Sequence, residues 1–457
     1  TWSEPSKTTV KQIMIGKIPI MLGSKLCVLS EKNTQNRREL GECKYDQFGY
    51  FIINGQEKVL VSHEKLVENK PCVFFAKNNK FSILCEVHSV NDNRYNIAKK
   101  TVVKLTNKDN TGIGRTIKIA VQGFKTDIPL FLLIRALGIT SDKEIIKMCA
   151  YDLEDSEITQ LLLPSIEEGI NALNQKDAID ELIKNISINS ITNYNLSAKE
   201  KKENKIKNLN DIFLNYLLPH LNHETEEDRQ TNFYRKAYYI GYMTNRMLNC
   251  LLKRRNYDDR DNLCNKKLET AGTLTAFLFS VIWRQKTLKN FVRDIKKDLS
   301  SIQGGIENIK IEKYLKPTII DTGIKRSFSI GDWGAKQNAN NRKGVSQLVV
   351  RHNFKSALSH TRRVITPLDS KSSKVTGPHM LHGSHWGYLC AAETPDGPQI
   401  GVHKNLTFTS TITNYVNPIN IYEILDYHEV TMLEEFNIFT DLKKNTKIFV
   451  NGIWTGI

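Results

Sequence analysis

Residues 49–61 read Gly-Tyr-Phe-Ile-Ile-Asn-Gly-Gln-Glu-Lys-Val-Leu-Val. Two β-prone runs, Tyr50–Ile53 and Lys58–Val61, lie on either side of the dipeptide Asn54-Gly55. Asn and Gly tolerate the positive φ angles of a two-residue hairpin turn, and β-branched and aromatic residues favour strands. This stretch therefore predicts an antiparallel hairpin and a strand-rich beginning of the fold.

The strand pattern extends in both directions from this hairpin. Ile13–Leu22 is apolar with Gly and Pro breaks, so residues 12–67 are expected to form strands and turns. Residues 71–125 continue the pattern in short runs separated by Asn- and Gly-rich turns. These runs are Cys72–Phe75, Phe81–Leu84, Thr101–Leu105 and Thr116–Ile119.

Helical periodicity replaces the strand pattern near Asp127 and dominates to about residue 315. The apolar run from Pro129 to Gly138 predicts a helix with proline at its start and glycine at its end. Ser141-x-x-Glu144 predicts a capping box on the next helix.

Two later segments differ sharply in their apolar pattern. Residues 234–254 predict a long amphipathic helix, and Tyr239, Ile240, Met243 and Met247 are expected in the core. The Lys- and Asn-rich stretch Asn189–Asn210 lacks a clear apolar face and is expected to be a mobile connection.

The composition is that of a globular chain with an excess of positive charge. Its 457 residues are 40% hydrophobic and 25% charged, and 65 Lys and Arg against 49 Asp and Glu give a net charge of +16. A chain of this length forms roughly two to four domains, so the predicted fold class is α+β multidomain. The eight cysteines contain no C-x-x-C pair, which argues against a disulfide scaffold or a zinc ribbon. No apolar run is long enough to span a bilayer.

Positive charge is concentrated between Lys325 and Lys374. Eleven basic residues in this segment accompany two acids, Asp332 and Asp369, and eleven minus two gives +9, more than half of the +16 of the chain. This localisation favours nucleic acid as the partner over the alternative of a solvated basic surface. The basic residues are Lys325, Arg326, Lys336, Arg342, Lys343, Arg351, Lys355, Arg362, Arg363, Lys371 and Lys374.

Gln347 and Arg351 are four residues apart and are expected to share one face of a helix. Glutamine can donate to or accept from a nucleotide, and arginine binds phosphate through a planar fork of donors. Arg362 and Arg363 then lead into the polar loop Thr366–Pro378, which could follow a nucleic-acid backbone. The residues expected to pack inward from this helix are Val345, Leu348 and Val349.

Two clusters contain metal-ligand residue types. The histidines of the first are favoured to hydrogen-bond with neighbouring backbone, and the acids of the second to form an ion-pair turn, because no spaced acceptors of a calcium loop follow. A metal-dependent hydrolase that uses either cluster is an alternative. The clusters are His379, His382, His385 and Cys390, and Asp258, Asp259 and Asp261.

Glu393–Pro398 has the composition of a rigid turn, with Pro and Gly at positions that restrict or free φ. Glu393 and Asp396 could act as an acid–base pair. The favoured interpretation is a turn in which Asp396 bonds its own backbone.

The motifs of this part of the chain occur in a characteristic order. This series resembles the fork region of the second-largest subunit of cellular RNA polymerases, in a form more similar to eukaryotic and large-DNA-virus subunits than to bacterial ones. The motifs are Gly331–Gly334, Gly344–Gln347, Leu358–Arg363, Leu381–Gly387 and Glu393–Gly401.

The resemblance covers nearly the whole chain and implies five parts. Gly16–Leu22 and Gly49–Val59 resemble the protrusion, Asp127–Gly138 resembles the lobe, and Lys447–Gly456 resembles the external region. The implied division is a mixed β/α protrusion at 1–75 and 256–325, a lobe with a β part and a helical part at 76–255, a basic fork at 326–412, and the start of the external region at 413–457.

The resemblance also implies roles for residues of the fork. Glu393 belongs to the packed base of the fork, adjacent to the active centre, and no residue of this chain is expected to be catalytic or to bind a metal. The residues expected to contact nucleic acid are Lys336, Arg342, Lys343, Gln347, Arg351, Arg362, Arg363, Lys371 and Lys374.

The implied function is that of a subunit of a DNA-directed RNA polymerase, a nucleotidyltransferase. The chain would form one wall of the active-centre cleft and hold the RNA–DNA hybrid and downstream DNA. It is expected to correspond to the N-terminal half of the subunit, to start inside the protrusion and to be inactive alone. Mg²⁺ is expected in the assembled enzyme, and the zinc site of the family lies beyond this chain.

The expected partners are the largest subunit, smaller subunits, the DNA template, the RNA–DNA hybrid and transcription factors, but no membrane. The expected location is intracellular: the nucleus, or the cytoplasm or virion for a viral source. The alternative is a non-catalytic nucleic-acid-binding protein derived from such a subunit.

Overall fold

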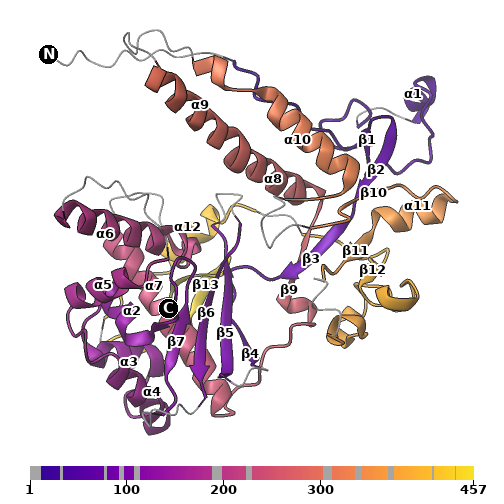
Figure 1. Ribbon diagram of the computed structural model, residues 1–457. Helices are drawn as coiled ribbons and strands as arrows, with labels where there is room; N and C mark the ends of the chain where they lie inside the picture. The colour runs from indigo at the N-terminus through magenta and orange to yellow at the C-terminus, as the bar shows by residue number, and fades with distance from the viewer. Residues whose placement is uncertain are drawn as a thin grey trace. The chain divides into compact units, whose positions relative to one another are not determined.

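The computed structural model describes most of the chain in two compact units. Unit 1 contains residues 1–65 and 261–412, and unit 2 contains residues 66–260 and 413–457. Both combine helices with sheets (Figure 1), which confirms the α+β multidomain prediction, whereas the five-part division stays a prediction. The described residues are 12–30, 34–76, 80–91, 97–107, 114–187, 198–222, 229–301, 311–334, 342–368, 375–413, 416–437 and 439–457.

Unit 1 contains the predicted hairpin. Strands β1 (Phe51–Ile53) and β2 (Gln56–Leu60) pair antiparallel. Asn54 and Gly55 have φ angles of 52° and 76°, as a turn with two positive φ angles requires. Strand β10 (Ser346–Leu348) pairs with the other edge of β2. The hairpin prediction is therefore confirmed.

A second sheet of unit 1 brings together strands from four distant parts of the chain. Its order is β12-β11-β3-β9. Strand β3 follows β2 almost directly and pairs parallel with β11, whereas β12 pairs antiparallel with β11. The strands are β3 (Ser62–Leu66), β9 (Lys266–Glu269), β11 (Arg363–Ile365) and β12 (His403–Asn405).

In unit 1, one long continuous helical segment has a second long helix beside it, as Figure 1 shows. Helix α8 (Ala271–Ile282) continues through the π-helical turn Trp283–Thr287 into α9 (Leu288–Ser301), and α10 (Pro317–Ile330) packs on α8. Apolar side chains of α8 and α10 form one core with the hairpin sheet. Two short α-helices also belong to the described part of the unit, α1 (Thr34–Glu39) and α11 (Phe354–Thr361).

Trp333 lies at the centre of this core with none of its surface exposed. Its indole N–H donates to the carbonyl oxygen of Leu274 at 2.6 Å, and its ring lies 5.0 Å from that of Phe328. The ring thus ties α8 and α10 together, and its only polar atom is satisfied, as burial of an indole requires.

Unit 2 contains a five-stranded antiparallel sheet in the order β4-β5-β6-β7-β8. All four strands predicted between residues 71 and 125 are present. The strands are β4 (Cys72–Phe75), β5 (Phe81–Ser89), β6 (Lys99–Thr106), β7 (Ile117–Ala120) and β8 (Ile128–Pro129).

Helices follow this sheet, as the change of periodicity near Asp127 predicts. The long amphipathic helix is present as α7, and its four predicted core residues are fully buried. The helices are α2 (Leu130–Ala136), α3 (Asp142–Ala150), α4 (Ser156–Glu168), α5 (Gln175–Lys184), α6 (Ala198–Asn215) and α7 (Arg229–Leu251).

The prediction of a mobile connection at Asn189–Asn210 is wrong for residues 198–210, which belong to α6. The apolar face of this helix includes Leu209, Ile212 and Phe213, so most of it lies at or beyond the end of the polar stretch. The buried ammonium of Lys236 donates to the carbonyl oxygen of Phe213 at 2.6 Å and so caps the end of α6. Residues 189–197 lie outside the described residues.

Residues 413–457 belong to the same compact unit as residues 66–260. They contain α12 (Ile419–Tyr427), β13 (Ile448–Val450) and β14 (Ile453–Gly456). Trp454 is buried with its ring 5.6 Å from that of Tyr242 on α7.

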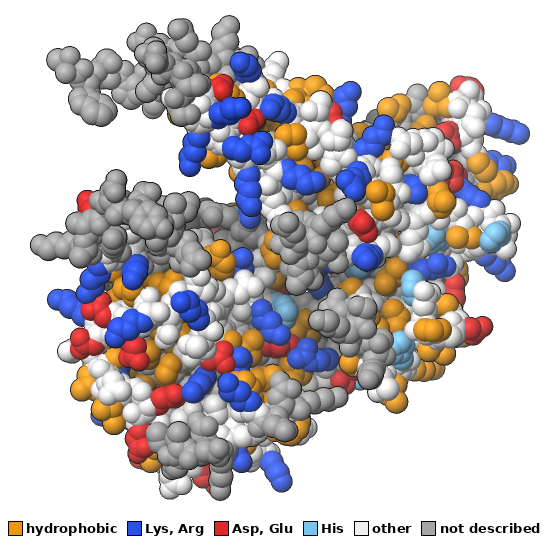
Figure 2. Space-filling model, in the orientation of Figure 1, with side chains coloured by type: hydrophobic (Ala, Val, Ile, Leu, Met, Phe, Trp, Pro, Cys, Tyr) orange, Lys and Arg blue, Asp and Glu red, His pale blue; other side chains and the backbone are white. Residues whose placement is uncertain are grey.

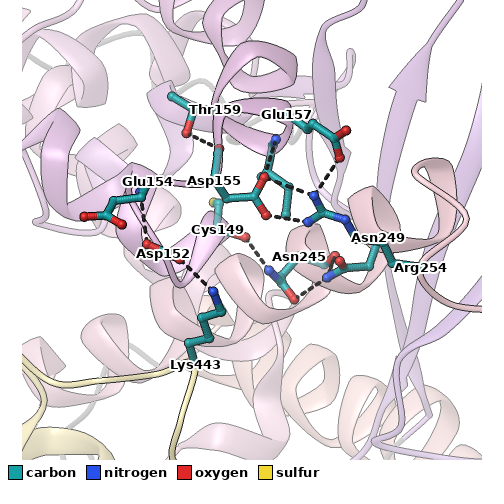
Figure 3. Close-up of polar contacts among 11 residues, drawn as sticks. Cys149, Asp152, Glu154, Asp155, Glu157, Thr159, Asn245, Asn249, Arg254 and Lys443 are labelled. Carbon is teal, nitrogen blue, oxygen red and sulfur yellow. Dashed lines mark hydrogen bonds and ion pairs between the residues drawn. The ribbon is translucent and has the colours of Figure 1, made fainter.

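Ion pairs reinforce this packing at the surface. Figure 3 shows Lys443 reaching the carboxylate of Asp152 at 2.8 Å. Beside it, the guanidinium of Arg254 lies between the carboxylates of Asp155 and Glu157, which precede and begin α4. The C-terminal segment is therefore held to unit 2 by both apolar and polar contacts.

Two local predictions are wrong. Residues 13–21 form no regular strand, because Pro19 cannot donate to a ladder and the backbone of Gly16 approaches Ile320 closely. Ser141 is the N-cap of α3, but its side chain accepts no hydrogen bond from the helix. Acidic residues in the first turn, Asp142 and Glu144, complement the helix dipole instead.

Within the described residues, no helix is both long enough and apolar enough to cross a bilayer.

Replacing Trp333 by Ala should lower the free energy of unfolding of the protein by about 3–5 kcal/mol, the usual cost of removing a buried aromatic side chain. Urea unfolding followed by circular dichroism measures this difference. The matched control is Trp386→Ala, because that ring is 89% exposed, and it should change stability by less than about 0.5 kcal/mol. Equal losses in both variants would contradict the assigned role of Trp333.

Candidate nucleic-acid interface

The segment expected to form a basic helix is divided among three elements. Gln347 lies in β10, where it pairs with Val59 of β2, and Arg351 follows in a loop before α11 begins at Phe354. The expected shared helix face of Gln347 and Arg351 is therefore wrong, because ladder bonds to β2 hold this stretch extended. Val345 is buried as expected, but Leu348 is 55% exposed.

Arg351 is bound by acceptors inside the protein. Its guanidinium donates to both carboxylate oxygens of Glu57, at 2.7 and 3.0 Å, and to Asp46 at 3.1 Å. It also lies 4.9 Å from the ring centre of Tyr50 and lines a pocket of about 270 Å³. The hydrogen bonds to Glu57 raise the pKa of Arg351 above its usual range. Its donors are thus largely used within the fold.

Arg342 and Arg362 are also held by internal acceptors. Arg342 forms an ion pair with Glu269 of β9, and its backbone pairs with that of Trp333. Arg362 donates to the carbonyl oxygen of Thr407. These contacts tie the fork segments to each other, so a count of basic residues overstates the charge available to a partner.

Arg363 differs from these three arginines. Its side chain is half-buried in β11 and makes no hydrogen bond or ion pair with the described residues. Its charge acts on two histidines: burial first, and then Arg363, lowers the pKa of His360 to about 4 and also lowers the pKa of His403. Arg363 is therefore flanked by neutral rings and has donors available for an external anion.

His360, whose pKa Arg363 helps to lower, holds the side chain of Gln347 in a defined orientation. The backbone N–H of Val350 donates to Nδ1 of His360 at 3.1 Å, so Nε2 carries the ring proton and donates to Oε1 of Gln347 at 3.0 Å. Nε2 of Gln347 donates to the carbonyl oxygen of Gly344 at 3.0 Å. The amide keeps a second N–H and a second lone pair for a nucleotide.

The remaining predicted residues are placed as follows. Lys343 is exposed, whereas Lys336, Lys371 and Lys374 lie outside the described residues. Glu393 accepts a hydrogen bond from the hydroxyl of Ser359, whose oxygen also lies 3.1 Å from Oδ1 of Asn405. Of the predicted residues, Gln347 is thus oriented by His360 and Arg363 keeps its donors available, whereas Arg342, Arg351 and Arg362 act as supports.

The loop around Glu393 is closed by Thr394 rather than by Asp396. The hydroxyl of Thr394 donates to the carbonyl oxygen of His403 at 3.0 Å and accepts from the N–H of Gly401 at 2.8 Å. The side chain of Asp396 makes no cap hydrogen bond to the short helix that follows it, so the expected Asp turn is wrong.

Backbone contacts of the histidine cluster follow the favoured interpretation. Nδ1 of His379 lies 2.8 Å from the carbonyl oxygen of Ile400, and Nδ1 of His382 accepts from the N–H of Ser384 at 3.1 Å. Asp258 accepts from the N–H of Val73 at 2.8 Å and forms an ion pair with Arg255 at 2.9 Å. No group of three or more His, Cys, Asp or Glu within the described ranges is arranged to hold a metal ion.

Sequence reasoning missed the buried ionic cluster that supports this interface. Glu64 on β3 accepts from Lys404 on β12 at 2.8 Å, from Lys266 on β9 at 3.0 Å and from Thr366, just after β11, at 2.8 Å. Burial opposes the ionised form of Glu64, but the two lysines hold its pKa below the usual range. Because its members are hundreds of residues apart, no local pattern signals the cluster.

Acidification should destabilise the protein partly through His360. Its folded-state pKa of about 4 lies below the ordinary value of 6.5, so the unfolded chain binds more protons between these pH values. The free energy of unfolding should therefore fall as the pH falls from about 6.5 to 4. In urea unfolding at several pH values, His360→Gln should show a smaller loss than the parent. The exposed His352 supplies the control variant His352→Gln, which should keep the parental pH dependence.

Comparison with known families and proteins shows which family this chain is similar to. The family description "RNA polymerase Rpb2, domain 2" matches residues 74–269, and "RNA polymerase Rpb2, domain 3" matches residues 347–412, which include Gln347 and Arg363. The chain is 36% identical to DNA-directed RNA polymerase II subunit 2 of Arabidopsis thaliana over 450 residues, which are 98% of this chain and 36% of that protein.

Relatives from other groups match at similar levels. DNA-directed RNA polymerase subunit 2 of Acanthamoeba polyphaga mimivirus is 31% identical, with 98% of this chain and 37% of that protein covered. DNA-directed RNA polymerase subunit Rpo2 of Saccharolobus solfataricus is 32% identical, with 93% and 34% covered. The chain thus spans about a third of the length of these curated relatives. The chain belongs to the second-subunit (Rpb2) family of DNA-directed RNA polymerases.

Proposed function

We propose that this chain acts as part of subunit 2 of a DNA-directed RNA polymerase and that its fork, residues 326–412, contacts the RNA–DNA hybrid. Two observations carry the hybrid contact: Arg363 has no acceptor among the described residues, and His360 orients the side chain of Gln347. Family membership supports the polymerase assignment.

In the polymerase reaction, an RNA 3′-hydroxyl loses its proton and bonds to the α-phosphate of an incoming nucleoside triphosphate, and the bond to the β-phosphate breaks with release of pyrophosphate. Two Mg²⁺ ions would supply electrostatic stabilisation. Ligands of these ions are expected in other parts of the enzyme. The residues of this chain act by holding and orienting nucleic acid. Arg363 binds a backbone phosphate through its planar fork, and Gln347 contacts a sugar or base edge.

Neutral histidines beside Arg363 matter to this role. Protonation of His360 or His403 would add a like charge next to the guanidinium and would remove the acceptor for the N–H of Val350 in the case of His360. Because burial and Arg363 keep both pKa values low, the site keeps one positive charge at neutral pH. Phosphate contacts of this kind depend on salt and carry little sequence information.

The remaining parts of the proposal concern the position and the neighbours of this chain in the assembled enzyme. The chain forms one wall of the active-centre cleft, beside the largest subunit, and also contacts smaller subunits, downstream DNA and transcription factors. Glu393 lies near the active centre at the base of the fork. The enzyme works in the nucleus, or in the cytoplasm or virion if the source is viral.

Arg363→Ala should weaken binding of an RNA–DNA hybrid and should reduce the slope of log affinity against log salt by about one, the effect of one lost phosphate contact. Fluorescence anisotropy with a labelled hybrid in purified polymerase measures both quantities. The matched control is Arg351→Ala, which removes an arginine already bound to Glu57 and Asp46. This control should keep the parental salt slope. A changed slope in Arg351→Ala with an unchanged slope in Arg363→Ala would reverse the assignment.

A further inference from the structure

Unit 1 contains a pocket of about 270 Å³ between helix α11 and the loop that precedes β1. Phe354, Ala357, Leu358 and Thr361 line one wall, and their spacing of three and four residues places them on one face of α11. The loop Tyr45–Tyr50 lines another wall. All four helix residues keep part of their surface exposed, although an apolar helix face is normally packed in a core. This face of α11 is therefore open to a bound molecule.

The loop wall is held in a defined shape by Asp46. Its carboxylate accepts hydrogen bonds from the backbone N–H of Phe48 at 3.0 Å, the hydroxyl of Tyr50 at 2.8 Å and the guanidinium of Arg351 at 3.1 Å. Phe48 has a φ angle of 60°, which a bulky residue rarely adopts. Its side chain packs so closely on Gly23 that a Cβ there would lie 2.8 Å away. The wall is thus formed before a ligand binds, which lowers the ordering cost of binding.

The charged groups placed against this pocket nearly balance. Arg351 donates to two carboxylates, and two further basic groups lie 4.8 and 4.6 Å from the ring centres of loop residues. Figure 2 shows hydrophobic side chains interspersed with basic and acidic ones over the part of unit 1 that contains α1 and α11. A charged ligand would gain little attraction here and would still lose its hydration. The five groups are Arg37, Lys44, Arg351, Asp46 and Glu57.

Two exposed side-chain amides, those of Gln47 and Asn353, also line the pocket. Oδ1 of Asn353 accepts from the N–H of Ser356 at 2.8 Å as the cap of α11. Nδ2 of Asn353 and the amide of Gln47 make no hydrogen bond with the described residues. Both therefore keep N–H donors for a carbonyl oxygen at the edge of a ligand.

We propose that this pocket binds a small, neutral, planar aromatic compound that carries a carbonyl group. The rings of Tyr45, Phe48, Tyr50 and Phe354 offer stacked and edge-on contacts to such a compound. The volume lies just below the range of roughly 300–1,000 Å³ for drug-sized sites, which favours a ligand of about two fused rings. Quinolin-2-one has these properties and serves as the probe.

The pocket is separate from the fork interface, because neither Gln347 nor Arg363 lines it. It is also poorly suited to a nucleic-acid backbone, because the arginine in its lining, Arg351, already donates to Glu57 and Asp46. A phosphate would lie close to these two carboxylates and be repelled by them.

The test is saturation-transfer NMR with quinolin-2-one and the purified polymerase, titrated to give a dissociation constant. Ala357→Phe places a ring inside the pocket and should abolish the binding that depends on it. Phe354→Ala removes one exposed ring and should weaken binding roughly 2- to 12-fold, the value of one aromatic contact. The matched control, Lys355→Phe, adds the same ring to an exposed position of α11 that does not line the pocket, and it should keep the parental affinity.

Charged analogues test the assigned ligand class. Quinoline-2-carboxylate and N-methylquinolinium should bind more weakly than the neutral probe, and equal or tighter binding of either at this pocket would overturn the class. A base of a nucleic acid shares the chemistry of the probe, but a single-stranded dT oligonucleotide should not displace it, because its phosphates meet no free cation in the lining. Displacement by the oligonucleotide would assign the pocket to nucleic acid and overturn the proposal.

Two outcomes of the variant comparison would also overturn the proposal. The first is unchanged probe binding in Ala357→Phe, and the second is an equal loss in Ala357→Phe and Lys355→Phe, which would indicate damage to α11. Because Arg363→Ala is read out with an RNA–DNA hybrid, failure here is distinguishable from failure of the fork interface.

Discussion

The buried carboxylate of Glu64 is the interaction on which the geometry of unit 1 depends. It joins all four strands of the sheet β12-β11-β3-β9, through its own strand and through Lys404, Lys266 and Thr366. Only 2% of the Glu64 side chain is exposed, so removal of either lysine would leave a buried charge poorly compensated, a change that is strongly destabilising.

The same sheet displays the candidate interface on its opposite face. Strand side chains alternate, and Val364 pairs with Lys404, so Val364, Lys404 and Glu64 point to one side. Arg363 and His403 then point to the other side. A slip of β11 by one residue would exchange these faces and bury Arg363 against the two lysines. The ionic cluster therefore sets the register that exposes the guanidinium.

The net charge between Lys325 and Lys374 is larger than the charge that these side chains can offer to a binding partner. The segment between Lys325 and Lys374 carries a net charge of +9, but three of its arginines already donate to acceptors in the protein. Arg342 donates to Glu269, and Arg351 donates to Glu57 and Asp46. Arg362 donates to the carbonyl oxygen of Thr407. These arginines fasten loops together, which a planar guanidinium with five donors does well. Some basic side chains of this segment therefore hold the fold together, and others remain available to a partner. The presence or absence of an internal hydrogen-bond acceptor distinguishes the two groups.

The sequence by itself determined the elements whose signals are local. The hairpin at Asn54-Gly55, the strands from Cys72 to Ile119 and the core face of α7 follow from turn chemistry and periodicity within a few residues. Motif order in the fork was enough to identify the family. These features depend on backbone preferences and on apolar spacing, which neighbouring residues specify.

Only the tertiary structure decided which polar side chains are available. Gln347 and Arg351 have helical spacing, yet pairing with β2 places Gln347 in a strand, and Arg351 meets Glu57, almost three hundred residues earlier. The orientation of Gln347 depends on a histidine ring whose proton position is set by Val350. Hydrogen bonds and ion pairs form between groups a few ångströms apart in space, however far apart the residues are in the sequence. Their partners can therefore be identified only in the folded chain.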